Sequence, residues 1–124
     1  MHVLYLTKDL IFSSRVCSLA RAAGITIDVS SSIDASLTKG DTALVIIDLG
    51  LPQLDIAAAV SQLRETARDV KIMAYGPHVD AAMLAAAERA GCDLVLPRSQ
   101  FDQQIAAILR ESTSSPADAD HREA

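Results

Sequence analysis

Asp48 is the residue of this chain whose position most strongly suggests chemistry. It follows four large aliphatic residues in "LVIIDLGLP", residues 44–52, and a proline comes four positions after it. A continuous apolar run of this kind is typical of a strand that is buried on both faces of a parallel sheet. Functional groups in open α/β sheets collect where the strands end, so we consider Asp48 a candidate nucleophile or metal ligand.

Polar or small residues also follow the other strands that we predict, and we expect them at the same edge of the sheet. These candidate site residues are Thr7, Lys8, Asp9, Gly76 and Arg98. Asp9 with Asp48 gives only a weak Mg²⁺ site, since this ion is usually held by several oxygens in octahedral geometry. Asp9 is also well placed to cap the helix that follows it.

Apolar periodicity predicts the elements that position these residues. Short apolar runs predict strands over 2–6, 25–29, 43–48, 70–75 and 93–97. Helical spacing predicts helices after Asp9, after a cap at Asp55, over 79–90, and after a capping pair of Ser99 with Asp102, and at most a short helix lies around 33–37. Five alternating β-α units, (βα)5, predict a flavodoxin-like α/β fold, in which a five-stranded parallel sheet carries helices on both faces.

Composition limits the possible functions of the chain. Its 124 residues are half apolar and fit one domain over 1–111, followed by a polar tail over 112–124 that we expect to be flexible. A net charge of −5 with no Lys/Arg cluster argues against nucleic-acid binding. We expect no membrane span and no signal peptide, and the two cysteines suit a reducing compartment, so a cytoplasmic protein is predicted.

Two segments resemble the receiver domains of response regulators. "LVIIDLGLP" is similar to the third strand and following loop of that family, in which an Asp followed four residues later by Pro marks the phosphoacceptor. "AGCDLVLPRSQF", residues 90–101, resembles the family's "AGADxxLxKPF" region, and the likeness extends over about residues 2–110. The resemblance implies a receiver-like version of the flavodoxin-like fold with Asp48 at the phosphoacceptor position.

The other site positions that the resemblance implies carry different residues. The family has an acidic pair that binds Mg²⁺ after the first strand, a Ser or Thr after the fourth, and a Lys followed by Pro after the fifth. Many members also carry a mobile aromatic on the fifth strand. The matching residues here are Thr7 and Lys8, Gly76, Arg98 followed by Ser99, and Val95. Only Asp48 is unchanged, which makes this a degenerate, pseudo-receiver-like site.

These changes predict a protein that signals without phosphoryl transfer. A carboxylate attacks a phosphoryl group poorly unless a cation offsets the developing charge, and Lys8 places a fixed positive charge where Mg²⁺ would bind. We therefore expect no cofactor and no enzymatic activity. Our hypothesis is that Lys8 and Arg98 neutralise Asp48 directly. The predicted function is that of a stand-alone receiver-like protein in two-component signalling that acts through a protein partner.

Two alternatives remain open from the sequence. Asp48 could accept a phosphoryl group with Mg²⁺ and help from Asp9 and Arg98, as part of a phosphorelay. The strand-end crevice could instead bind a small ligand, although the chain lacks the phosphate loop and stacking aromatics of such sites. A homodimer through the 79–110 region is also possible, because the Ala-rich helix over 79–90 leaves a small apolar surface.

Overall fold

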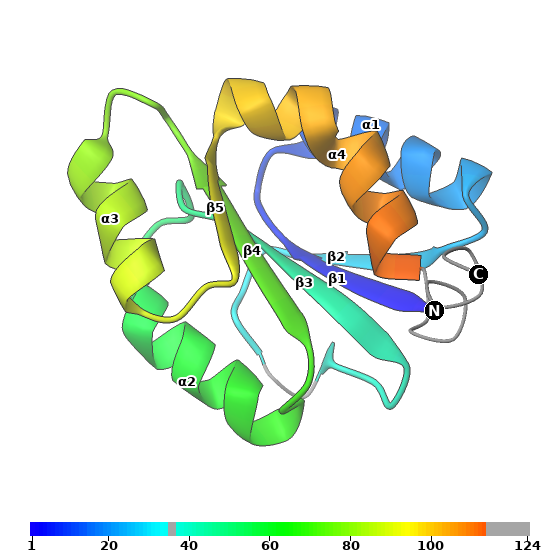
Figure 1. Ribbon diagram of the computed structural model, residues 1–124, viewed down its shortest axis with the longest axis horizontal. Helices are drawn as coiled ribbons and strands as arrows, with labels where there is room; N and C mark the ends of the chain where they lie inside the picture. The colour runs from blue at the N-terminus through cyan, green and yellow to red at the C-terminus, as the bar shows by residue number, and fades with distance from the viewer. Residues whose placement is uncertain (35–36, 114–124) are drawn as a thin grey trace, which may run out of the picture.

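The protein is a parallel five-stranded sheet between two layers of helices (Figure 1). The computed structural model describes residues 1–34 and 37–113. The strands are β1 (His2–Leu6), β2 (Thr26–Ser30), β3 (Thr42–Asp48), β4 (Lys71–Gly76) and β5 (Leu94–Pro97), and the helices are α1 (Leu10–Ala22), α2 (Ile56–Thr66), α3 (Ala81–Arg89) and α4 (Arg98–Thr113). The strand order is β2-β1-β3-β4-β5 with every pair parallel, which confirms the predicted fold class.

Two apolar cores flank the sheet because successive side chains of a strand point to opposite faces. Tyr5 of β1 and Ile46 of β3 lie in the core under α1 and α4, whereas Leu6 and Ile47, one position later, lie in the core under α2 and α3. Figure 1 shows these two pairs of helices on opposite sides of the sheet. A strand buried on both sides needs a continuous apolar run, which is why the central strands could be predicted well.

Only four of the five predicted β-α units contain an α-helix in the described part of the chain. Between β2 and β3 the described residues form bends, turns and a 3₁₀ position at Leu37, and residues 35–36 of the predicted short helix lie outside the description. Ile33 and Leu37 still pack against the core under α2. The Ser, Asp, Thr and Gly residues of this segment favour turns over helix, which explains the difference.

Aspartates cap the first three helices. The Oδ1 atoms of Asp9, Asp55 and Asp80 each accept a hydrogen bond from the backbone N–H three residues later. Because Asp80 is the N-cap, α3 begins at Ala81, and the prediction of a helix that starts at residue 79 is wrong. Val79 is 80% exposed. The residue that α3 buries fully is Ala87.

The start of α4 also differs from the prediction. The chain passes directly from β5 into α4 at Arg98, without an intervening loop. Ser99 therefore lies inside the first turn of α4 and is not its N-cap. Asp102 forms an ion pair with Arg15 of α1 at 2.9 Å. At its other end α4 continues to Thr113, two residues past the predicted domain boundary, and residues 114–124 of the predicted tail lie outside the described part. Both cysteines are free.

Candidate functional site

The candidate site lies where β1 and β3 end. These neighbouring strands feed helices on opposite faces of the sheet, so their carboxyl ends form the position at which α/β proteins of this type place their functional groups. The fold brings Thr7 and Asp48 into direct contact there. Asp9 and Arg98 form a second contact beside them.

Both carboxylate oxygens of Asp48 accept hydrogen bonds from the domain itself. Oδ2 accepts from the Thr7 hydroxyl at 2.6 Å, and Oδ1 accepts from the Gly50 backbone N–H at 2.8 Å. A Cβ atom at position 50 would come within 3.1 Å of Oδ1, so this close approach favours glycine. Asp48 is half-buried, and its carboxylate joins the end of β3 to the end of β1.

The Thr7 hydroxyl is used both as a donor and as an acceptor. It donates to Asp48 and accepts from the Asp9 backbone N–H at 3.0 Å. The side chain is buried, with 2% of its surface exposed. The Thr7 hydroxyl therefore has both a donor and an acceptor role filled within the site.

Asp9 and Arg98 form an ion pair that links the starts of α1 and α4. Arg98 Nη2 donates to Asp9 Oδ2 at 2.6 Å, while Asp9 Oδ1 accepts from the Phe12 N–H at 2.8 Å. The Arg98 guanidinium also lies 4.8 Å from the centroid of the Phe12 ring. The Phe12 N–H and then Arg98 hold the pKa of Asp9 below its usual value.

The predicted neutralisation of Asp48 by cations is therefore wrong. Arg98 pairs with Asp9, and no ion pair joins Asp48 to Lys8 or to Arg98, all of which are described. Lys8 is exposed. Neutral donors can satisfy Asp48 because its side chain is only half-buried, so water still solvates part of its charge.

A side chain at position 76 would be crowded by its neighbours. A Cβ atom there would lie 3.3 Å from Leu49 Cβ and 3.3 Å from Met83 Sδ. These distances are shorter than ordinary van der Waals contact between such atoms. Apolar atoms of Leu49 and of Met83 in α3 thus lie close to the position that a side chain of residue 76 would occupy.

The residues present do not fit a Mg²⁺ site. No group of three or more His, Cys, Asp or Glu side chains in the described ranges could hold a metal ion. Asp9 already binds Arg98, and both oxygens of Asp48 are engaged by N–H and O–H donors. Mg²⁺ would have to share these oxygens with the donors and approach the positive charge of Arg98, which opposes binding.

A buried tyrosine pair, which we did not predict, lies beside this site. The hydroxyls of Tyr5 and Tyr75 lie 2.5 Å apart, and Tyr75 stacks on Phe101 of α4 at a centroid distance of 4.2 Å. Burial raises the pKa of Tyr75 to about 12 and that of Tyr5 still further above its usual range. Phe12 completes the cluster, which contains all four aromatic residues of the chain. The chain has so few aromatic residues that their gathering in one core could have been considered from the sequence.

Comparison with known proteins gives a result for structure but not for sequence. No family model and no curated protein matches the chain. Among solved structures, the signal receiver domain of a response regulator from Bermanella marisrubri is 19% identical, with a TM-score of 0.74 over 91% of this chain and 98% of that one. A response regulator receiver domain protein from Clostridium thermocellum is 14% identical, with a TM-score of 0.74 over 90% and 92%.

A third match is a putative response regulator from Chloroflexus aurantiacus, 18% identical, with a TM-score of 0.72 over 90% of this chain and 95% of that one. At sequence identities this low, the structural likeness shows a shared fold and does not show a shared activity. The chain therefore has the fold of the response-regulator receiver domains.

Proposed function

We propose that this protein is a receiver-like signalling component that acts through contact with a protein partner and is not phosphorylated at Asp48. One observation carries the proposal, namely that Thr7 and Gly50 engage both oxygens of the Asp48 carboxylate. A nucleophile must direct a free lone pair at the incoming phosphorus atom. Each hydrogen bond uses one lone pair of its oxygen and draws electron density from the carboxylate, which makes Asp48 a weaker nucleophile.

The surroundings of Asp48 further support this proposal. Phosphoryl transfer needs positive charge at the oxygens of the phosphoryl group in the transition state. Arg98 is paired with Asp9, and Lys8 is exposed to solvent. Gly76 has no hydroxyl to bind the phosphoryl group, and Leu49 and Met83 would crowd a larger side chain there.

The surface of α3, β5 and α4 is our proposed contact region. Ala81 and Ala82 are exposed on α3, and Leu94 and Val95 of the edge strand β5 are only half-buried. A receiver domain similar in fold, that of NtrC4, is described as a dimer in its beryllofluoride-activated form. We infer that this face binds either a second copy or a partner protein, and not nucleic acid, since the net charge is −5.

A cytoplasmic location is part of this proposal and rests on the two free thiols, Cys17 and Cys92. No described helix is long and apolar enough to cross a membrane.

Intact mass spectrometry tests whether Asp48 is phosphorylated. The protein is incubated with acetyl phosphate and Mg²⁺, and the variant Asp48→Asn is treated in parallel. We expect no labile adduct of about 80 Da in either sample. An adduct that forms in the wild type and is lost in Asp48→Asn would refute phosphorylation independence.

Affinity capture tests the contact itself. Partners captured by the wild type should be captured equally by Asp48→Asn and should be unaffected by acetyl phosphate. Exposed alanines of α3 offer the surface variant, Ala82→Glu, with Ala22→Glu on the outer face of α1 as its matched control. Loss of the partner in Ala82→Glu alone supports the proposed face, whereas loss in the control alone contradicts it.

A further inference from the structure

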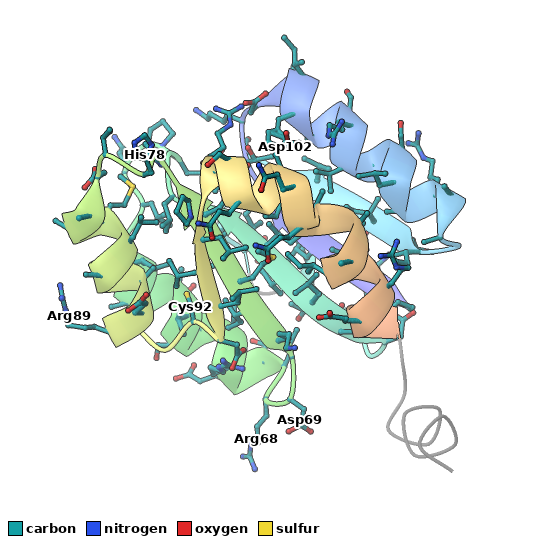
Figure 2. All side chains as sticks on the ribbon, turned by 45° about the horizontal axis from the view of Figure 1, so that its top comes forward. Arg68, Asp69, His78, Arg89, Cys92 and Asp102 are labelled. Atoms are coloured by element: carbon teal, nitrogen blue, oxygen red, sulfur yellow. The ribbon has the colours of Figure 1, made fainter. Side chains whose placement is uncertain are left out.

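A groove of about 720 Å³ lies on the α1 and α4 side of the sheet, where β4 and β5 end. Its walls are the starts of α1 and α4 and the loop between β4 and α3. Figure 2 shows His78 on that loop and Asp102 near the start of α4. The groove has the size of a small-molecule site, and Asp48 does not line it.

Apolar side chains form part of the groove. Ile11 is 88% exposed at the start of α1, and Pro77 lines the groove from the β4–α3 loop. The ring of Phe12 lies beneath the Arg98 guanidinium. An isoleucine that is almost fully exposed next to a concave surface provides apolar area that a ligand could cover.

Two ion pairs give the groove charges of both signs. Arg98 pairs with Asp9, and Arg15 pairs with Asp102. The bonds found use only Nη2 of Arg98 and Nε of Arg15, although a guanidinium has five N–H donors. Asp102 is half exposed and uses Oδ1 for Arg15, which leaves Oδ2 as an acceptor.

We infer that this groove binds a small zwitterion with an apolar side chain, of the amino-acid class. The ligand carboxylate would bind the unused N–H donors of Arg98 and Arg15, and its ammonium group would bind Asp102. Two arginines and two aspartates balance in formal charge, so a simple anion or cation would meet repulsion as well as attraction. A molecule that carries both charges complements the groove, and its side chain covers Ile11 and Pro77.

This inference goes beyond the proposed function, because the bound ligand would be the signal for a domain that is not phosphorylated. The groove is connected to Asp48 by successive hydrogen bonds from Arg98 to Asp9, from the Asp9 N–H to Thr7, and from Thr7 to Asp48. A ligand carboxylate on the unused donors of Arg98 would share this guanidinium with Asp9 and weaken the Asp9 contact, which would alter the contacts of the site.

Titration with L-tryptophan, followed through backbone amide shifts, tests the inference. We expect saturable shifts over 9–15, at residue 78 and over 98–102, the segments that contain the groove residues with an N–H group. Tryptamine lacks the carboxylate and indole-3-propionate lacks the ammonium group, so each should bind about tenfold more weakly, as expected for the loss of one charged hydrogen bond. Equal binding of all three compounds, or no saturation at about 10 mM, would overturn the inference.

Variants localise the binding and separate it from folding. Asp102→Asn and Arg98→Gln should each weaken L-tryptophan binding about tenfold. Arg21→Gln, at the far end of α1 and outside the groove, is the matched control and should leave the affinity within about twofold. Thermal melts identify any variant that is unfolded, and Asp102→Asn is then decisive because its side chain is half exposed. Wild-type affinity in Asp102→Asn would contradict the assigned role of that carboxylate.

Discussion

Replacing Thr7 by Val removes one hydroxyl and preserves the shape of the side chain. In the folded protein this deletes the hydrogen bond to Asp48 Oδ2 and leaves the Asp9 N–H without its acceptor. A hydrogen bond to a charged group contributes about 1.5–3 kcal/mol, and a neutral one about 1 kcal/mol. Because Asp48 is only half-buried, water will replace part of the loss. We therefore expect the free energy of unfolding to fall by about 2–3 kcal/mol.

Urea denaturation followed by circular dichroism measures this difference. Thr26→Val, at an exposed position of β2, is the matched control and should change the free energy of unfolding by less than about 0.5 kcal/mol. Thr7→Ser keeps the hydroxyl and should recover most of the loss. A cost below about 0.5 kcal/mol for Thr7→Val would refute the view that Thr7 and Asp48 hold the strand ends together.

A double-mutant cycle assigns the energy to this pair. The side chain introduced by Asp48→Asn has a single acceptor oxygen. It can accept from Thr7 or from Gly50 but not from both, so one hydrogen bond is lost. The combined variant Thr7→Val with Asp48→Asn should then be more stable than additivity predicts, by about 1 kcal/mol. Strict additivity would show that the two side chains do not interact in solution.

Four further predictions concern other contacts. Gly76→Ser should lower the free energy of unfolding by about 1–2 kcal/mol, because its Cβ would crowd Leu49 and Met83, and no loss in urea denaturation would contradict this. Arg64→Met should cost about 1–2 kcal/mol by removing bonds to Val70 O, Gly91 O and Asp93, whereas its control Arg68→Met, at a side chain that projects into solvent in Figure 2, should cost almost nothing. The Phe12 N–H and Arg98 hold the pKa of Asp9 below 3.8. The stability that the ionised Asp9 contributes is therefore present above that pH and is lost as the pH falls through the folded pKa. In urea denaturation below about pH 4, Asp9→Asn should lose stability less steeply with falling pH than the wild type. Burial raises the pKa of Tyr75 to about 12, so stability should be present below about pH 10 and be lost above it, with tyrosinate absorbance appearing together with unfolding and not before it.

The sequence was sufficient for the sheet and insufficient for some helix boundaries. The buried strands carry continuous aliphatic runs that only a doubly covered sheet explains, and β1 was predicted with its observed bounds. The α3 boundary failed because helical periodicity extends through Val79, while the capping bond of Asp80 starts the helix later. An apolar residue in register with a helix is thus no proof that it belongs to the helix.

The candidate site was predictable in its members and not in its contacts. Strand ends place Thr7, Asp48 and Arg98 at one edge of the sheet whatever their rotamers are. Whether Arg98 reaches Asp48 or Asp9 depends on a long, flexible side chain and on the Phe12 ring that supports it, and neither is visible in residue spacing. The Tyr5 and Tyr75 pair is similarly hidden, since it joins residues 70 positions apart.

The contacts of Asp48 supply a reason for a carboxylate at this position that does not involve phosphorylation. Two donors, the Thr7 hydroxyl and the Gly50 N–H, converge on the end of β3 from different segments. A side chain there must accept two hydrogen bonds within a short reach. Leu or Ala would leave a donor of the buried Thr7 unsatisfied, and Asn offers only one carbonyl oxygen. Asp meets the requirement with two acceptor oxygens on a single methylene. An aspartate at the end of the third strand in this fold is therefore weak support for phosphoryl transfer, unless the cation and the hydroxyl that such transfer requires are found beside it.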